Sequence, residues 1–596
     1  MKNLILLFTA FLGINAVANA EAAFWGVASG DVSSNDAVLW TRVVDDTAPS
    51  ELPLTALVST EPTVTQNILS FTTSTVAVRD FTAKVVVGGL KAGTTYYYRF
   101  ASGSLQSGIG KFKTAPDATV AAPVTFGFSG DVDGQMRPYP LAAEFPKLGL
   151  DFFAFVGDVI YETGSQGSPA VTVSGTVPAP SEKGATQAQL FADYSRKYRE
   201  QFVPVNPNGQ PGLAPLFSSQ GNYTLYDNHE LGNRQYINGG APAGGPVGDM
   251  AVGAGVDARD PANDVNRTGS AMNQSPGFRT LQQVYANYEP VREIWEGGAL
   301  RLYSAQNWGK NVLFVNLDTR TYRDIRLKTK DNADDTGARA ANPGRTYLGK
   351  SQLAWLKLTL LEAQSSGVKW KFITTSDPID QLGPLGGNLT GVFNGGNDKY
   401  SPVASDGGKA WMGGYRAERN ELLKFIADHK IRNVVFLTTD DHQNRVNEIL
   451  YAPDGQTEVQ GAYVPVPSCF EIVVGPLGAT GPDLITDHSF DNLKKIADSL
   501  ASAQKAVGVD PVGLSPRYPG LHNVVRKDDA QADKLRQPID FYSPDTFNLA
   551  VLSVTADGKT LTVKTVGRPS TVVNAFTEGS ALPPASTILS FQVDAQ

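Results

Sequence analysis

The side chains best suited to chemistry in this sequence stand in short polar segments, each of which follows a run of strand-forming residues. Five such segments contain Asp131, Asp158, Asp227, Asp377 and Asp440. In an open α/β sheet the carboxyl ends of the strands share one edge, where such folds bind ligands. Carboxylates, an amide and imidazoles gathered there would stay desolvated and repel one another unless cations neutralised them. The pattern therefore predicts a metal centre, most simply a pair of ions.

Each of these residues taken alone has a plainer interpretation. An aspartate after a strand usually caps a helix or forms a turn. A lone histidine, such as His429, His488 or His522 here, is more often surface or core filler than a ligand. The metal centre is favoured because a polar segment with an aspartate follows each of five predicted strands.

The motifs also match a known family in content and order. Residues 157–162 read Gly-Asp-Val-Ile-Tyr-Glu, residues 227–230 read Asp-Asn-His-Glu, and residues 318–323 read Asp-Thr-Arg-Thr-Tyr-Arg. Over most of residues 24–480 the chain resembles the alkaline phosphatase D (PhoD) family of calcineurin-like metallophosphoesterases. The resemblance implies hydrolysis of a phosphate ester by in-line attack of a metal-bound hydroxide, with both cations stabilising the transferring group.

Two departures from the family pattern bear on the metals. The family usually has a Ser-Cys pair after the first strand of its catalytic domain, and the thiolate is a metal ligand. This chain has Ser129-Gly130 followed by Asp131, so Asp131 or Asp133 is expected to replace the thiolate. The late motif, residues 439–442, reads Thr-Asp-Asp-His where Gly-Asp-x-His is usual, which keeps both ligand types. These departures leave the identity of the metals more open than the type of reaction.

Six residues are expected to hold the metal ions. Asp158 is the best bridging ligand, because one carboxylate between two cations offsets both charges. Asn228 offers a neutral carbonyl oxygen, and Tyr161 could bind Fe(III) as a phenolate or pack its ring under the loop. The full set is Asp131, Asp158, Tyr161, Asn228, Asp440 and His442. Oxygen-rich ligation with only five histidines in the chain favours hard ions, Ca²⁺ and Fe³⁺, over zinc.

His229 and Arg234 are the expected catalytic residues. His229 follows Asn228, so its ring can reach the edge of the site and either protonate the leaving oxygen or hydrogen-bond the charged phosphoryl group. Asp227 or Glu230 would orient it. Arg234 is the arginine nearest this motif, and a guanidinium fork matches two phosphate oxygens; a surface role fits it equally well.

Two domains after a leader would position these residues. Residues 1–20 combine a positive start, an apolar run and a small-x-small ending, which is typical of a cleaved signal peptide and predicts a secreted or periplasmic protein. Residues 21–118 alternate short β-runs with turns and predict an all-β sandwich of the fibronectin III or immunoglobulin type. Residues 119–596 contain continuous apolar runs typical of strands buried on both faces, and predict an α/β domain. The resemblance makes this a metallophosphoesterase domain with a two-sheet β core flanked by helices.

The sequence also predicts the local structure of four further segments. Residues 239–264 are rich in Gly, Ala, Pro and Asp and are either a loop beside the site or disordered, and residues 165–183 are a second surface excursion. Residues 487–507 are a candidate amphipathic helix. Residues 549–554 and 560–566 predict a terminal hairpin that closes on the second sheet.

Composition limits the partners. The chain has 596 residues, with 51 Lys and Arg against 59 Asp and Glu and no basic tract, so a nucleic-acid or anionic membrane partner is not expected. Cys469 is the only cysteine, which excludes an internal disulfide. No apolar run after the leader reaches the length of a membrane span. We expect a monomer that acts on small-molecule phosphate esters.

Three functions fit these patterns. The first is a secreted phosphatase that hydrolyses phosphomonoesters, and phosphodiesters as a further substrate. The second is a phospholipase D-like phosphodiesterase, and the third is a noncatalytic binding protein whose site decayed when the family cysteine was lost. The third is the weakest, because the chain retains Asp158, Asn228, His229, Asp440 and His442.

Overall fold

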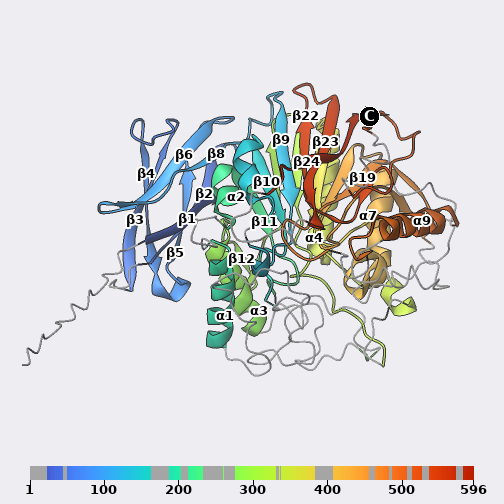
Figure 1. The fold of residues 1–596 in the computed structure, drawn as a ribbon, viewed down its shortest axis with the longest axis horizontal. Helices are drawn as coiled ribbons and strands as arrows, with labels where there is room; N and C mark the ends of the chain where they lie inside the picture. Colours follow the sequence, from blue (N-terminus) through green and yellow to red (C-terminus); the bar gives the residue numbers. More distant parts are fainter. Residues whose placement is uncertain are drawn as a thin grey trace, which may run out of the picture.

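The structure is a computed structural model in which two large β-sheets pack together beside a smaller all-β lobe (Figure 1). It describes residues 23–44, 50–137, 139–162, 187–202, 212–231, 259–260, 276–330, 335, 337–382, 407–455, 463–481, 486–506, 513–525, 536–571 and 582–596. Expectations for residues 1–20 and 165–183, and for 239–264 apart from Arg259 and Asp260, lie outside these ranges.

The N-terminal lobe is the expected β-sandwich. Its strands are β1 (Ala23–Gly30), β2 (Asp36–Val44), β3 (Glu51–Ser59), β4 (Leu69–Val76), β5 (Thr82–Gly88), β6 (Thr95–Ser102), β7 (Leu105–Gln106) and β8 (Gly110–Lys113), with a 3-10 turn, η1 (Ala77–Arg79). One layer contains β4, β3, β6, β7 and β8, and the other contains β1, β2 and β5. Leu39 and Val87 of one layer share a buried core with Val58, Tyr98 and Phe112 of the other.

The first catalytic sheet is built on three parallel strands. They are β9 (Val124–Ser129), β10 (Phe152–Val156) and β11 (Gly221–Leu225), and all five residues of β10 are buried. Four antiparallel strands extend the sheet beyond β9: β22 (Thr546–Val554), β23 (Thr560–Pro569), β24 (Ser586–Asp594) and β20 (Leu521–His522). The predicted hairpin is therefore confirmed, but the expectation that it closes on the second sheet and ends the fold is wrong. It pairs with β9 through β22, and β24 follows it.

The second catalytic sheet has seven strands and a parallel centre. Their order is β14 (Ser304–Trp308), β15 (Val312–Asn316), β16 (Trp370–Thr375), β17 (Val434–Thr438), β19 (Val464–Val473), β18 (Asn444–Tyr451) and β21 (Tyr542–Ser543). Strands β15, β16, β17 and β19 are parallel to one another. A separate two-stranded ribbon pairs β12 (Trp295–Glu296) with β13 (Ala299–Leu300).

Aromatic rings join the two catalytic sheets. Phe126 of β9 stacks on Phe152 with ring centroids 4.6 Å apart, and it meets Phe372 of β16 edge-on at 4.9 Å. All three rings are fully buried. Edge-to-face and offset aromatic pairs add stabilisation beyond the apolar area that they bury. This packing fixes the strand ends of one sheet relative to those of the other.

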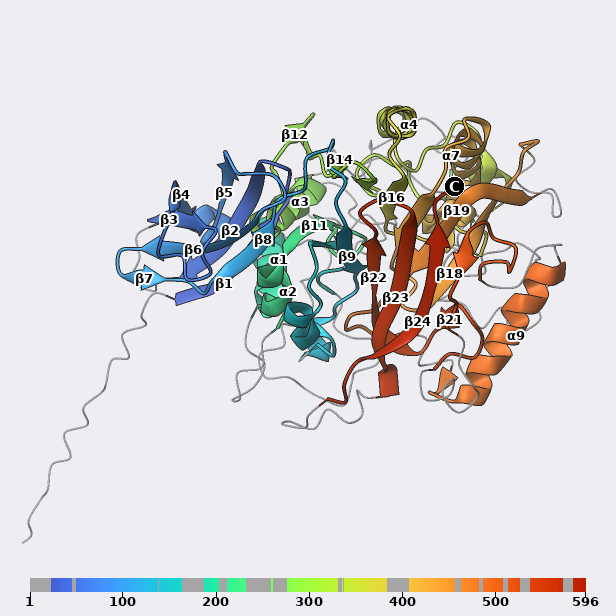
Figure 2. The same cartoon turned by 90° about the horizontal axis from the view of Figure 1, so that it is seen from above.

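Helices flank this β core, as expected. The α-helices are α1 (Gln187–Glu200), α2 (Ala214–Ser219), α3 (Pro276–Tyr288), α4 (Lys350–Ser365), α6 (Trp411–Gly414), α7 (Arg416–Asp428) and α9 (Phe490–Ala506). Short 3-10 segments are η2 (Gly134–Met136), η3 (Ala142–Lys147), η5 (Ala338–Ala341) and η6 (Gly407–Lys409). Figure 2 shows α4 and α7 together on the second sheet, with which they share a core, and α1 to α3 grouped beside the junction of the sandwich and the first sheet. The candidate helix at 487–507 is confirmed as α9.

The sandwich is continuous with the first catalytic sheet. Strand β1 pairs in parallel with β11 at Gly30 and Asn222, so β1, β2 and β5 extend that sheet to ten strands. A Cβ atom at Gly30 would lie 2.3 Å from the Pro290 carbonyl oxygen, so only glycine allows this approach. Trp40 also donates from Nε1 to the Asn287 carbonyl oxygen at 2.7 Å. The predicted boundary at residue 118 falls between β8 and β9, and the division into two domains stays a prediction.

Within the described chain, no helix has the length and apolar character needed to cross a membrane.

Candidate metal centre

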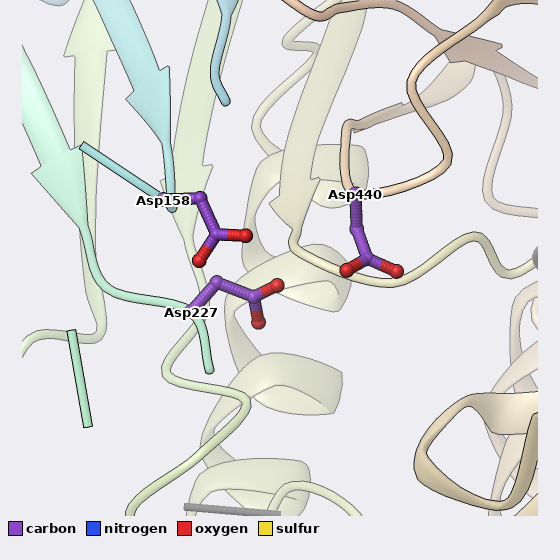
Figure 3. Close-up of side chains that lie close together, drawn as sticks. All are labelled: Asp158, Asp227 and Asp440. Carbon is purple, nitrogen blue, oxygen red and sulfur yellow. The ribbon is translucent and has the colours of Figure 1, made fainter. Parts of the chain in front are cut away.

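The predicted site residues that the structure describes come together at one place between the two catalytic sheets. Asp131, Asp158 and Asp227 follow β9, β10 and β11 of the first sheet, whereas Asp440 and His442 follow β17 of the second. One carboxylate oxygen of each of Asp158, Asp227 and Asp440 lies within 4.8 Å of the others. Figure 3 shows Asp158 and Asp227 on one side and Asp440 facing them from the other. Segments far apart in the sequence thus share one acidic cluster.

The backbone turns sharply where these side chains are presented. Asp131, Asp158, Asp440 and His442 have φ angles of 63°, 55°, 65° and 52°. Residues with a Cβ atom rarely adopt this left-handed conformation, and such strain tends to collect at functional sites. The turns allow each strand to end and its next polar side chain to face the cluster.

Three atoms that commonly bind metals converge on one side of the cluster. The Tyr161 hydroxyl lies 2.6 Å from His442 Nε2, and the same nitrogen lies 3.4 Å from Asp131 Oδ1. Asp131 is fully buried, and its Oδ1 has no hydrogen-bond donor among the described residues. Asp131 Oδ2 lies 3.4 Å from the backbone nitrogen of Asp440. Asp131, one of the two candidates for the thiolate position, therefore lies beside His442.

The His229 ring lies between Tyr161 and Glu162. Its Nδ1 lies 2.5 Å from Glu162 Oε2, and its ring stacks on that of Tyr161 with centroids 3.8 Å apart. The His229 backbone also donates to Asp158 Oδ1 at 3.1 Å. Glu162 is fully buried, so its carboxylate is a fixed partner for the imidazole.

The expectation that Asp227 or Glu230 orients His229 is wrong, because both carboxylates have other partners. Glu230 accepts hydrogen bonds from the backbone nitrogens of Asp227 and Val159, which links the loops after β10 and β11. Burial raises the pKa of Glu230 to about 7 despite these bonds. Glu162 stands in the quoted motif, but no spacing rule shows that its side chain meets His229 on another loop.

A buried arginine holds Asp227. Arg320 Nε donates to Asp227 Oδ1, and Arg320 Nη2 lies 3.2 Å from Asp377 Oδ2. All three side chains are almost completely buried. Burial alone would raise the pKa of Asp227, but the charges of Arg320 and Lys409 outweigh it and lower that pKa. The sequence places Arg320 in a family motif without showing this role.

Lys409 reaches the cluster from η6 and was not predicted. Its Nζ lies 2.5 Å from Asp440 Oδ1, 3.3 Å from Asn228 Oδ1 and 3.9 Å from Asp377 Oδ1. The side chain is 3% exposed. Lys409 stands in a Gly-Gly-Lys segment that carries no recognisable motif. Arg234, the predicted phosphate-binding residue, lies outside the described residues.

The electrostatics of the cluster fit a bound cation. Burial, followed by the charges of Asp227, Glu230 and Asp131, raises the pKa of Asp158 well above its usual range. Burial also raises the pKa of Asp440, against the opposing effect of Lys409. Buried carboxylates at such short separations are costly to ionise together, and a metal ion among them removes that cost. The oxygen atoms of the aspartates suit a hard ion.

Comparisons with known proteins agree with this geometry. A family model described as PhoD-like phosphatase matches residues 127–510, and a second, described as its N-terminal domain, matches residues 13–116. Alkaline phosphatase D of Bacillus subtilis (strain 168) is 28% identical over 436 residues, which cover 70% of this chain and 64% of that protein. The match thus spans slightly under two thirds of the length of that relative.

Two solved structures were compared with the fold. One described as PhoD has a TM-score of 0.65 at 21% identity, and the match covers 96% of this chain and 90% of that one. This likeness shows a shared fold. A purple acid phosphatase from yellow lupin seeds matches with a TM-score of 0.47 at 10% identity, covering 96% of this chain and 74% of that one.

Replacing Arg320 tests its role as the fixed partner of two buried aspartates. We expect Arg320→Met, measured in chelator, to lower the free energy of unfolding by about 3–5 kcal/mol, because Asp227 and Asp377 would stay buried without the guanidinium charge that they share. Arg196, whose side chain is 51% exposed in its ion pair with Asp193, gives the matched control. Arg196→Met should change stability by less than about 1 kcal/mol. Equal effects of the two substitutions in urea titrations would contradict this role.

Proposed function

The chain belongs to the PhoD-like phosphatase family, and from this premise we propose that it is a secreted, metal-dependent phosphatase that hydrolyses phosphomonoesters. The observation that carries the proposal is the convergence of Asp158, Asp227 and Asp440 oxygens, from two sheets, within 4.8 Å of one another. Phosphodiesters are proposed as a second substrate. Export rests on residues 1–20, whose pattern is typical of a signal peptide.

We assign two metal positions to the cluster. Asp131, Tyr161 and His442 would hold one ion, and the phenolate that Tyr161 can form suits Fe³⁺. Asn228 and Asp440 would hold the other through oxygen atoms, which suits Ca²⁺. Asp158 would bridge the two. We add Asp227 to this set, because its Oδ2 is buried without a hydrogen-bond donor among the described residues.

Bound metal ions would supply an activated water and would neutralise charge on the phosphoryl group. The protein must therefore hold their ligands in place before substrate arrives, and the buried side chains and fixed loops of this cluster do so. Arg320 contributes by keeping Asp227 ionised and in one orientation.

We assign His229 the role of proton donor to the leaving oxygen. Nδ1 of His229 lies 2.5 Å from Glu162 Oε2, and we assign Nε2 to the substrate. A carboxylate on one ring nitrogen orients the imidazole, as a positioned general acid requires. The stacked Tyr161 ring restricts rotation of the imidazole. Glu162 acts through His229 and is a positioning residue.

Hydrolysis of two chromogenic esters tests the function. We expect the mature protein to release p-nitrophenol from p-nitrophenyl phosphate, and more slowly from the bis-ester. Removal of metal by EDTA should abolish both activities, and Ca²⁺ with Fe³⁺ should restore them. Faster hydrolysis of the bis-ester would favour a phosphodiesterase. Absence of metal-dependent release from either ester would contradict the proposal.

Replacement of His229 tests the proton donor. We expect His229→Ala to lower kcat for p-nitrophenyl phosphate about a hundredfold or more, because a positioned general acid contributes that much. Metal content should stay near that of the wild type. His429, at the end of α7, provides the control, and His429→Ala should leave kcat unchanged. Near-normal turnover in His229→Ala would remove His229 from the mechanism.

A colour measurement tests the iron ligand. If Tyr161 binds Fe³⁺ as a phenolate, the purified enzyme should show a charge-transfer absorption band in the visible range, and Tyr161→Phe should lose it. Tyr223 is equally buried, but its hydroxyl donates to the Val32 carbonyl oxygen beside the sandwich. Tyr223→Phe should therefore keep the band. An active enzyme without colour would reject iron at this position.

A further inference from the structure

Lys409 is the cation closest to the second metal position. Its Nζ lies 2.5 Å from Asp440 Oδ1 and 3.3 Å from Asn228 Oδ1. These are the groups to which the proposed function, on which this inference rests, assigns one metal ion. An ammonium group and a metal ion cannot both occupy the small space between the same two oxygen atoms. The two cations must therefore exchange there.

We propose that Lys409 is a resident cation of the metal centre, which competes with the metal ion that uses Asp440 and Asn228. When that ion is absent, the ammonium group neutralises Asp440. When the ion enters, it must displace the lysine side chain from both oxygens.

The side chain of Lys409 is suited to this exchange, whereas that of Arg320 is not. Lysine places a compact point charge on a flexible four-carbon stem, but arginine binds carboxylates through a rigid planar fork. Arg320 contacts Asp227 through Nε and Nη2 and Asp377 through Nη2, and it is fully buried. A hydrogen bond holds the Lys409 backbone in place, because its carbonyl oxygen accepts from Arg323 Nη1 at 3.0 Å. The main chain thus stays fixed while the ammonium group moves.

The two metal positions then differ in affinity. No lysine or arginine of the described chain makes an ion pair or hydrogen bond with Asp131, Tyr161 or His442, so the ion there meets no resident cation. The ion at Asp440 and Asn228 must displace the Lys409 ammonium group. One ion should therefore bind tightly, and the other should exchange readily with the metal in solution.

Calcium titration of the mature, chelator-treated protein tests this inference independently of activity. In isothermal titration calorimetry we expect the wild type to bind two Ca²⁺ ions with different affinities. Lys409→Met should tighten the weaker ion by at least about tenfold, because the competing charge is gone. Lys409→Gln should have the same effect. Because it keeps a polar group, it provides the test if Lys409→Met does not fold. Lys409→Arg should leave the weaker affinity near or below that of the wild type.

Lys371 provides the matched control. It is also buried, but it lies near the start of β16, at the opposite end of the strand from Asp377. Lys371→Met should leave both Ca²⁺ affinities unchanged. If Lys409→Met, Lys409→Gln and Lys371→Met all bind Ca²⁺ as the wild type does, the inference is overturned while the proposed metal centre stands. If neither the wild type nor any variant binds a metal ion, the proposed function fails as well.

Discussion

The proposed metal centre depends on keeping several buried aspartates ionised within a few ångströms of one another. Asp158, Asp227 and Asp440 bring oxygen atoms within 4.8 Å, and Asp131 lies beside Asp440. Burial and like charge both oppose this arrangement, as the raised pKa of Asp158 shows. Protonation or nearby cations can offset such a cluster, and the proposed metal centre requires cations.

The described part of the fold places Arg320 and Lys409 beside the cluster. Arg320 is fixed between Asp227 and Asp377, and Lys409 reaches Asp440 from a segment outside the parallel strands. Aromatic packing between β9, β10 and β16 fixes the two sheets relative to each other, and β1 extends the first sheet into the sandwich. The sandwich therefore supports the sheet that carries Asp158, although none of the proposed ligands lies on it.

The sequence predicts the strand ends well and the contacts between loops poorly. Strands β9 and β10 match their apolar runs residue for residue, because strands buried on both faces must be continuously apolar. Asp131 and Asp158 follow these two strands as expected. Asp440 and His442 follow β17 of the second sheet, so the packing of two sheets, and not the edge of one, brings them to the same place.

The sequence does not predict that Glu162 rather than Asp227 meets His229, that Lys409 enters the cluster, or that the C-terminal hairpin pairs with β9. Each depends on how separate segments pack in three dimensions, which local pattern does not specify.

The most direct test of the metal centre is anomalous X-ray diffraction from crystals of the metal-loaded protein. We predict one anomalous peak bounded by Asp131, Asp158, Tyr161 and His442, and a second beside Asp440 and Asn228. Crystals of active enzyme with no metal within coordination distance of Asp158 would contradict the account.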